Sequence, residues 1–369
     1  MVPKLLLKNK INVMKKKLKI LFLAPGQSIH SHKWINFFSE KYQIYWCHTG
    51  KIKKKNENIK YYFLREGLNT FFLPIIFFIN ILYIKPDIIH IHSISKNLFI
   101  SFFSVIFFKQ KTILNPWGSD VFSPKLFVKF LQYFIKGNII FTDSFIIKKI
   151  FERNNRVFKV NFGIDLKYYN NVKNKNFKKR EKIIFSPRGY SKVYNQFLLV
   201  EFVKKNKNKL KNFRFIIAGA VDKVELLFLK KYISKYNLKN LISLKSHLNK
   251  DLYKNFLISS YLVISASRSD AGLSSCIAEA MSSKSIVLCT NNRDNPYWIK
   301  NNINGFLFKD NDLKDLEKKF FYITNISNKK YLKISERSRQ TQKNFNNLSI
   351  EMLRAEKIYK KIHKHSCFN

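Results

Sequence analysis

A short stretch rich in small and hydroxyl-bearing residues, SRSDAGLSSCIAEAM (residues 267–281), carries the residue types best suited to chemistry. Gly and Ser before a helix leave backbone N–H groups at the positive end of the helix dipole, where a phosphate binds well. Glu279 follows one or two turns into the expected helix, and a carboxylate there accepts hydrogen bonds from hydroxyls such as those of a ribose. The alternative is an ordinary loop in which Ser274 or Ser275 caps the helix and Glu279 faces solvent.

The composition of the chain limits the classes of protein to which it can belong. Its 369 residues exceed one ordinary core, which favours two domains, and a hydrophobic content of 46% indicates globular domains rather than disorder. The formal net charge of +46 attracts phosphate-rich ligands and anionic membrane surfaces. A codon bias toward Lys, Asn, Ile, Phe and Tyr is an alternative source of much of this charge.

The cysteines and the N-terminus indicate a location in the cytoplasm. The four cysteines are too scattered for a zinc ribbon or a disulfide framework, which fits a reducing cytosol. LKILFLAPG resembles a signal peptide only faintly, because its apolar core is short and PGQS follows where a cleavage site should lie. We therefore expect a first strand there, Met14 as the functional start, and residues 1–13 as an extension that can be deleted without loss of folding or activity.

Two strongly apolar runs, residues 71–84 and 98–108, are shorter than the roughly 20 residues that a membrane-spanning helix needs, and Pro74 interrupts the first. They fit buried helices or, alternatively, a patch that faces a membrane. The basic stretch KIKKKNENIK (residues 51–60) lies just before the first run. We expect the first domain to attach peripherally to the inner, anionic face of the cytoplasmic membrane.

Short, continuously apolar runs alternate with longer helical stretches, which predicts parallel sheets covered on both faces. The expected strands cover residues 19–25, 42–48, 87–93, 111–117, 139–144 and 156–163, and then, after a polar stretch, 182–189, 213–219, 241–246, 261–267 and 285–291. Two such series predict an α/β fold of two doubly wound, Rossmann-like domains facing an interdomain cleft. Ligands bind at the carboxyl ends of such strands, where APGQSIHSH, NPWGSD, NFGID, SPRGY and SASRSDAG all lie.

In their order and spacing these motifs resemble the family 4 glycosyltransferases, which have the two-domain GT-B fold, over about residues 18–330. PDIIHIHS and PWGSD resemble a strand and a loop of the family's acceptor domain, FGID its crossover, and SPRGY and FIIAG the first strands of its donor domain. SRSDAGLSSCIAEAM followed by NPYWIKNNINGFLF resembles its donor-binding signature. The resemblance implies sugar transfer with retention of configuration, by front-face attack assisted by the departing phosphate.

The resemblance also implies the domain organisation. Residues 14–170 are expected to form an acceptor-binding domain, 171–182 a linker and 183–345 a nucleotide-sugar-binding domain. We expect residues 346–369 to form a helix that packs back toward the N-terminal domain.

For the donor, the resemblance gives Glu279 the ribose and gives the loop amides before it the sugar and phosphates. Arg188 leaves the first strand of the second domain, where its planar guanidinium can clasp a diphosphate and offset the charge that grows on the leaving group. A surface salt bridge is the alternative for Arg188, and Tyr194 is an alternative to Lys192 as its companion. We expect Arg188, Lys192 and Glu279 to be catalytic. The expected donor-binding residues are Arg188, Gly189, Lys192, Ser246, His247, Asp270, Ala271, Gly272, Leu273, Ser274 and Glu279.

The chain departs from the family pattern at three places. Ala271 occupies the position, eight before the helix Glu, where the family has an acidic residue, and Asp270 lies one position earlier. Either the loop contains one inserted residue or backbone groups alone recognise the sugar. Trp117 stands where relatives often have His, and no Lys occupies the usual place after Arg188 unless Lys192 fills it.

The expected acceptor-binding residues are Gly26, His30, His92, Trp117, Gly118 and Asp120. A helix-entry cap is the alternative for His30, and a cap of the following segment is the alternative for Asp120. His90 and His92 share one face of a strand, as two metal ligands would, but no third ligand is evident. We expect neither a metal nor a cofactor, because basic side chains and a helix N-terminus supply the positive charge.

The sequence therefore predicts a hexosyltransferase or related glycosyltransferase. It would move a sugar from a UDP- or GDP-linked donor to a glycan or lipid-linked acceptor, in the synthesis of polysaccharide or lipopolysaccharide of the cell surface. A nucleotide-sugar epimerase of the same fold is an alternative that needs additional acid/base carboxylates in the cleft. A nucleic-acid-binding protein is suggested by charge alone, and base-reading modules are missing. Nothing in the sequence selects the base, the sugar or the acceptor.

Overall fold

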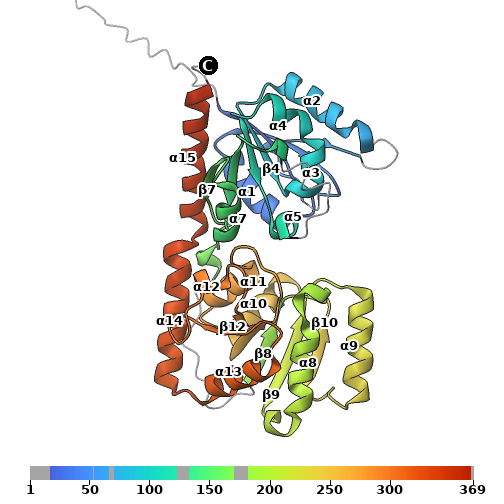
Figure 1. Cartoon of the computed structure of the whole chain (residues 1–369), viewed down its shortest axis with the longest axis vertical. Coiled ribbons are helices and arrows are strands. Elements are labelled where there is room, and N and C mark those ends of the chain that lie inside the picture. Colours follow the sequence, from blue (N-terminus) through green and yellow to red (C-terminus); the bar gives the residue numbers. More distant parts are fainter. Residues whose placement is uncertain (1–16, 53, 66–69, 123–132, 170–181, 367–369) are drawn as a thin grey trace, which may run out of the picture.

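The computed structural model describes residues 17–52, 54–65, 70–122, 133–169 and 182–366. Two domains follow each other along the long axis of the molecule, each a parallel sheet between layers of helices (Figure 1). The expected start at Met14 and the extension before it lie outside the described residues. So does nearly all of the expected linker, whose last residue, Lys182, begins a strand.

The first domain contains a seven-stranded sheet in the order β3-β2-β1-β4-β5-β6-β7, in which every pair is parallel. Its strands are β1 (Lys19–Leu23), β2 (Gln43–His48), β3 (Ile59–Phe63), β4 (Ile88–His92), β5 (Thr112–Asn115), β6 (Ile139–Thr142) and β7 (Arg156–Lys159). Its described helices are α1 (Ile29–Ser39), α2 (Leu73–Ile84), α3 (Ile94–Ile100), α4 (Phe102–Phe107), α5 (Gly118–Phe122) and α7 (Phe145–Phe151). One hydrophobic cluster lies on each face of the sheet, which explains why β4 is buried along its whole length.

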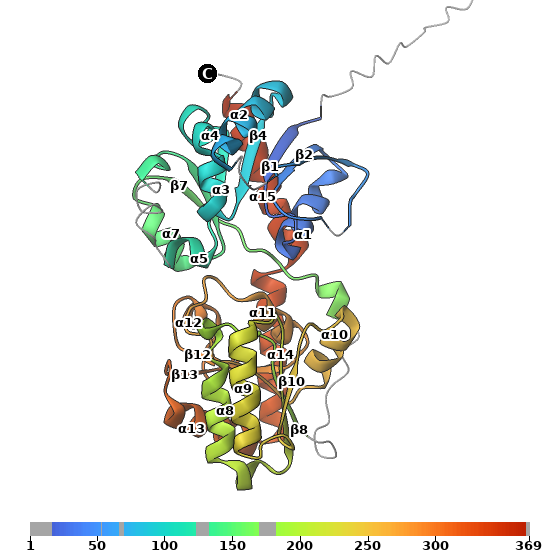
Figure 2. The same cartoon turned by 90° about the vertical axis from the view of Figure 1, so that its right-hand side faces the viewer.

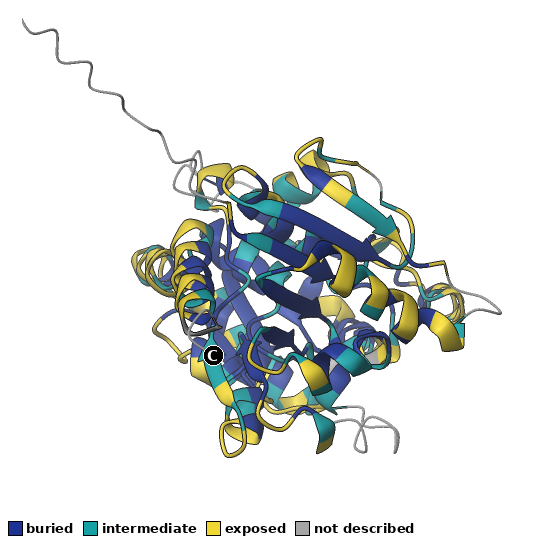
Figure 3. Ribbon diagram, turned by 90° about the horizontal axis from the view of Figure 1, so that it is seen from above, coloured by how far each residue is buried: buried dark blue, intermediate teal, exposed yellow. Residues whose placement is uncertain are grey.

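The second domain contains a six-stranded parallel sheet in the order β10-β9-β8-β11-β12-β13. Its strands are β8 (Lys182–Ser186), β9 (Phe213–Ala218), β10 (Ile242–Lys245), β11 (Leu262–Ser265), β12 (Ile286–Thr290) and β13 (Phe306–Phe308). Its helices are α8 (Gln196–Lys205), α9 (Lys223–Lys235), α10 (Lys250–Ser259), α11 (Ser275–Ser282), α12 (Asn295–Trp298), α13 (Leu313–Asn325) and α14 (Asn328–Phe345). Seen from above, the buried strands lie at the centre and the exposed surface is carried by helices and loops (Figure 3).

The C-terminal helices join the two domains along one side of the molecule (Figures 1 and 2). The last helix, α15 (Leu348–Ser366), packs on the first domain, where Tyr359 is fully buried and its hydroxyl accepts a hydrogen bond from the indole N–H of Trp34 at 3.0 Å. Two segments of the chain connect the domains, one around Ile164 and one around Asn346. They lie side by side, because the N–H of Ile164 donates to the carbonyl of Asn346 at 2.7 Å.

The expected fold class is confirmed, and the differences lie in the elements. Two strands were not expected: β3, which begins at the end of the basic stretch of residues 51–60, and the three-residue β13. The second apolar run is divided between α3 and α4, and Pro74 stands in the first turn of α2, where proline is tolerated, rather than breaking it. Among the described residues, no helix combines the length and the apolar character needed to cross a membrane.

Candidate active site

The candidate site lies where the carboxyl ends of the two sheets face each other. Strand order reverses between β1 and β4 in the first sheet and between β8 and β11 in the second, and such switch points open a crevice for a ligand. The loops that leave β8 and β11 carry Arg188 and Asp270. Opposite them, the ring of His30 lies at the start of α11, with its Nε2 atom 3.4 Å from the hydroxyl of Ser275.

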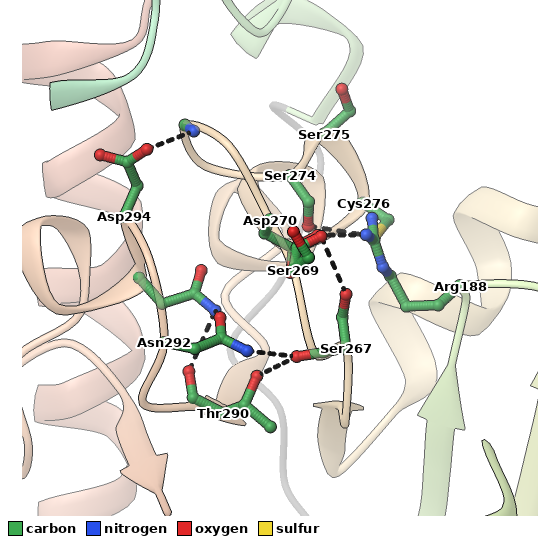
Figure 4. Close-up of polar contacts among 12 residues, drawn as sticks. Arg188, Ser267, Ser269, Asp270, Ser274, Ser275, Cys276, Thr290, Asn292 and Asp294 are labelled. Carbon is green, nitrogen blue, oxygen red and sulfur yellow. Dashed lines mark hydrogen bonds and ion pairs between the residues drawn. The ribbon is translucent and has the colours of Figure 1, made fainter. Parts of the chain in front are cut away.

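The loop before α11 is held by hydrogen bonds from the end of β12 and the residues that follow it (Figure 4). The carbonyl of Ser267 accepts hydrogen bonds from the hydroxyl of Thr290 and, at 2.7 Å, from the side chain of Asn292. Leu273 is buried in the core of the second domain. Ser274 stands at the N-cap of α11, and no hydrogen bond from its side chain caps the helix amides. This geometry leaves the first turn of α11 facing the cleft.

Arg188 and Asp270 form a nearly buried ion pair (Figure 4). The guanidinium also lies 3.5 Å from the sulfur of Cys276 and 4.5 Å from the ring centroid of Tyr194. Burial opposes the charge, but Asp270, Cys276 and Tyr194 together outweigh it and raise the pKa of Arg188 above its ordinary value. The residues expected to recognise a diphosphate are therefore brought together, with Arg188 already holding an anion.

Ala271 and Gly272 are held against the first domain. A Cβ atom on Gly118 would lie 2.6 Å from the Cβ atom of Ala271, so this contact requires two very small residues. Gly272 adopts φ +64°, and its N–H donates to Asp294 at 2.8 Å. The carboxylate of this loop stands one position earlier than in the family pattern, at Asp270, where it pairs with Arg188.

Glu279 is partly buried on α11. It accepts a hydrogen bond from the hydroxyl of Tyr253, on α10, at 2.7 Å. Burial raises the pKa of Glu279, while Tyr253 and Lys33 act to lower it. Lys33 belongs to α1 of the first domain and donates to the carbonyl of Gly163 at 2.6 Å. Residues of both domains thus surround the carboxylate that we expect to bind ribose.

Three other expected donor residues lie away from this cluster. The side chain of Lys192 is 86% exposed and pairs with Glu225 at 3.7 Å, so it does not join Arg188 and Asp270. Ser246 and His247 are exposed in the loop after β10. Gly189 lies beside Arg188 with φ +78°, where a Cβ atom would collide with the backbone of Ala220.

On the acceptor side, His30 lies among aromatic side chains of the first domain. Its ring centroid is 4.7 Å from that of Phe162 and 6.0 Å from that of Trp117. Burial and the neighbouring Lys33 lower the pKa of His30 to about 4, so the imidazole is neutral at pH 7. Gly26 is buried and packs against Gly50.

Asp120 and His92 serve the interior of the first domain. Asp120 is buried and accepts hydrogen bonds from the N–H groups of Trp117 (2.7 Å) and Ile94 (2.9 Å), which joins the loops after β4 and β5. His92 is fully buried, and burial and His30 lower its pKa to about 3. His90 contacts the hydroxyl of Tyr359 at 2.5 Å. No group of three His, Cys, Asp or Glu side chains in the described part of the chain is arranged to hold a metal ion.

Five polar residues in and around the site were not identified from the sequence: Lys33, Asp143, Lys159, Tyr253 and Asp294. The acidic Asp143 and Asp294 meet at the domain boundary, and burial raises the pKa of Asp143 to about 7 although Lys159 acts to lower it. Of the five, only Asp143 could have been found from the sequence. It directly follows the apolar run of β6, at the carboxyl end of a strand, where ligands bind in such sheets.

Two family models match the chain in succession. Residues 19–149 match "Glycosyl transferase 4-like" and residues 169–341 match "Glycosyl transferases group 1". A comparison with curated proteins gives no match.

Solved structures of low sequence identity share the fold over almost the whole chain. A glycosyltransferase from Rickettsia africae ESF-5 is 19% identical, with a TM-score of 0.73 and coverage of 94% of this chain and 98% of that chain. Sucrose-phosphate synthase from Thermosynechococcus elongatus is 11% identical, with a TM-score of 0.80 and coverage of 95% and 100%. Anabaena HepE, solved with UDP and glucose, is 12% identical, with a TM-score of 0.73 and coverage of 93% and 100%.

Proposed function

The chain belongs to the group 1 glycosyltransferases of the family 4 type, with the GT-B fold, and from this premise we propose a reaction for it. It transfers a hexosyl or related group from a nucleotide diphosphate sugar to a hydroxyl of a glycan or lipid-linked acceptor, in the synthesis of a cell-surface polysaccharide. The observation that carries this proposal is the placement of Arg188 and Glu279 on the loop and helix of one switch point, facing the first domain.

In the proposed complex, Glu279 accepts hydrogen bonds from the ribose hydroxyls, and the first turn of α11 faces the phosphates. Arg188 binds the diphosphate and stabilises the charge that grows on it as the sugar leaves. The bond from C1 of the sugar to the phosphate oxygen breaks, and the acceptor oxygen bonds to C1 on the same face. Because attack and departure use the same face, configuration is retained, and the acceptor proton passes to the departing phosphate oxygen. This scheme uses side chains and backbone amides for the positive charge, and we propose that it needs no metal or cofactor.

UDP is the first nucleotide to test, because HepE, which shares the fold, was solved with UDP. The protein can be incubated with a panel of UDP- and GDP-linked sugars, with and without acceptor. It should release UDP or GDP only from the true donor. We expect Glu279→Gln to weaken donor use by tenfold to a hundredfold, because a hydrogen bond to a charged group contributes about 1.5–3 kcal/mol. An epimerase would instead convert the donor without releasing nucleotide. Stabilisation by short DNA, and none by any nucleotide, would refute the proposal.

We propose in addition that the first domain docks on an anionic membrane, at the inner face of the cytoplasmic membrane, where a lipid-linked acceptor is presented. Helix α2 supports this, because it is apolar on both sides. Leu73, Phe77 and Ile81 are buried against the sheet, whereas the opposite face is exposed. That exposed face consists of Ile75, Ile76, Ile79, Leu82 and Tyr83, and Phe71, Phe72 and Phe107 extend it. A contiguous exposed apolar face of this kind marks an interaction surface.

The charge around this face suits an anionic bilayer. Between residues 70 and 122 the acidic residues are Asp87 and Asp120 alone, and both are engaged in hydrogen bonds within the domain. Lys85, at the end of α2, and Lys109, after α4, are exposed. The net charge of +46 opposes pairing of two copies, and each Lys near an anionic membrane surface contributes roughly 1 kcal/mol at low salt.

Vesicle co-sedimentation tests this docking without a glycosyl transfer assay. Wild-type protein should bind phosphatidylglycerol vesicles, more weakly as salt rises, and phosphatidylcholine vesicles poorly. Ile79→Ser with Leu82→Ser should lower binding at least tenfold. The matched control is Val224→Ser with Leu227→Ser on α9 of the second domain, where exposure is similar (74% and 54%, against 58% and 51% on α2). Equal binding of the two double variants, or of neutral and anionic vesicles, would refute the docking surface.

A further inference from the structure

Asp294 connects the two domains although it belongs to the second. It is fully buried at the start of α12. Its Oδ1 atom accepts hydrogen bonds from the backbone N–H groups of Phe145 (2.8 Å) and Ile146 (3.3 Å), and the hydroxyl of Ser144 donates to Oδ2. A carboxylate of the second domain therefore caps α7, a helix of the first domain, and complements the positive end of that helix.

The same carboxylate holds the loop of residues 270–274. Its Oδ2 atom accepts a hydrogen bond from the N–H of Gly272 at 2.8 Å (Figure 4). Gly272 has φ +64°, and a Cβ atom there would lie 2.2 Å from a carboxylate oxygen of Asp143 in the first domain. The centre of the loop is thus held between Asp294 and the first domain.

Aromatic packing continues this contact beyond the hydrogen bonds. The ring of Phe145 stacks on that of Tyr297, with centroids 4.8 Å apart. The ammonium group of Lys159 lies 4.2 Å from the ring centroid of Phe145 and 4.7 Å from that of Trp298, so it stands between rings of the two domains. The boundary between α7 and α12 is therefore a packed surface, and Asp294 is its hydrogen-bonded centre.

We infer that Asp294 is a positioning residue that couples the shape of the loop 270–274 to closure of the two domains. Both oxygens of Asp294 are occupied only while α7 lies against α12. Separation of the domains removes the three donors of the first domain and frees the carboxylate to move, so that it no longer fixes the amide of Gly272. The inference rests on the proposed function only in assigning this loop to the nucleotide sugar.

Hydrogen exchange of the peptide that spans residues 270–274 tests the coupling without any nucleotide. The decisive variant is Ser144→Ala, because Ser144 lies in the first domain and its hydroxyl contacts Asp294. We expect Ser144→Ala to raise exchange in the loop about fivefold. Asp294→Asn should raise it further, because asparagine has a single side-chain oxygen and cannot accept from Gly272 and from the amides of α7 at the same time. Asp312→Ala is the control, since Asp312 caps α13 within the second domain.

Nucleotide binding provides a second readout. Asp294→Asn should weaken UDP binding, and raise the donor KM, about tenfold, and the effect of Ser144→Ala on UDP binding should vanish in the Asp294→Asn background. Asp294→Asn keeps the volume of the side chain, so it decides the question if Asp294→Ala does not fold. Unchanged loop exchange in Ser144→Ala would overturn the coupling. Failure of UDP and GDP to bind the wild-type protein would instead overturn the nucleotide assignment, and the exchange result would stand.

Discussion

Arg188 is held by Asp270 in an ion pair of which only 13% of the arginine side chain and 4% of the aspartate side chain are exposed. The carboxylate of Asp270 thus already occupies the guanidinium that we propose binds the diphosphate. A bound diphosphate must therefore share Arg188 with Asp270 or displace it. The stability of the free protein and its affinity for nucleotide then depend on the same carboxylate in opposite directions.

We predict that Asp270→Asn destabilises the free protein but increases the stabilisation that UDP provides. Removal of one partner leaves the guanidinium without its counter-ion, which costs about 3–5 kcal/mol in a fully buried pair, and we expect about 2 kcal/mol at this partly exposed site. The diphosphate restores the missing negative charge. Chemical unfolding with and without UDP measures both effects. The control is Glu201→Gln, which breaks an ion pair with Lys204 that is more exposed (25% and 32%). An equal UDP shift in the variant and the wild type would show that the diphosphate does not reach Arg188.

We predict that Tyr253→Phe moves the acidic limb of the pH profile of kcat/KM to higher pH by about one unit. Burial raises the pKa of Glu279 and the Tyr253 hydroxyl acts to lower it, so loss of the hydroxyl raises that pKa further. The ionised carboxylate binds the ribose, so activity is lost as the pH falls through this pKa, and the variant loses it earlier. Tyr168→Phe is the control, because its hydroxyl contacts the carbonyl of Lys250 instead. If the acidic limb of Tyr253→Phe is the same as that of the wild type, a group other than Glu279 determines it.

The fold was predictable because its signals are local. Continuous apolar runs of four to six residues, such as β4 and β12, separated by helical stretches, are sufficient to indicate parallel sheets buried on both faces. Strand β3 was missed because it lies at a sheet edge, where two of its five residues are exposed, and because a lysine interrupts its apolar residues. The loop of residues 270–274 was found because its glycine and serine directly precede a helix.

The partners of the site were not predictable, because they come from distant parts of the chain. Asp294 contacts Ser144, which is 150 residues away, and Lys33 influences Glu279 from a helix of the other domain. Lys192 was proposed from the resemblance, as the Lys that relatives place shortly after the Arg, yet its side chain turns toward Glu225. Sequence spacing defines neighbours along a loop, whereas the domain boundary brings together residues that no local pattern links.

We predict that domain closure weakens as the pH rises from about 4 to about 7 and is constant above that range. In the closed structure burial raises the pKa of Asp143 to about 7, with Lys159 opposing and Asp294 reinforcing the shift. When the domains separate, the pKa of Asp143 returns toward the ordinary value of about 3.9. A group whose pKa is raised in the closed state favours that state while it is protonated, so closure is favoured at low pH. Small-angle scattering across this range should show a growing radius of gyration, and Asp143→Asn should remove the dependence. A dependence that persists in Asp143→Asn would assign it to another group.

The last prediction concerns Gly272, which combines a left-handed backbone with a contact across the domain boundary. Gly272→Ala places a Cβ atom 2.2 Å from Asp143 Oδ2, in addition to the roughly 1 kcal/mol that a positive φ costs alanine. We expect the domains to separate, with a larger radius of gyration and at least tenfold weaker UDP binding. Gly137→Ala is the matched control, because Gly137 has φ +88° but the nearest atom to its added Cβ lies 3.9 Å away.

A second substitution separates the collision from the backbone strain. Asp143→Ala removes the carboxylate that the new methyl group would meet, but it leaves φ at position 272 unchanged. If the collision is the cause, Gly272→Ala combined with Asp143→Ala should return to the radius of gyration of the wild type, and only the strain should remain as a loss of about 1 kcal/mol in the free energy of unfolding. If the combined variant stays as open as Gly272→Ala alone, backbone strain in the loop is the cause, and the approach of Asp143 to Gly272 does not control closure.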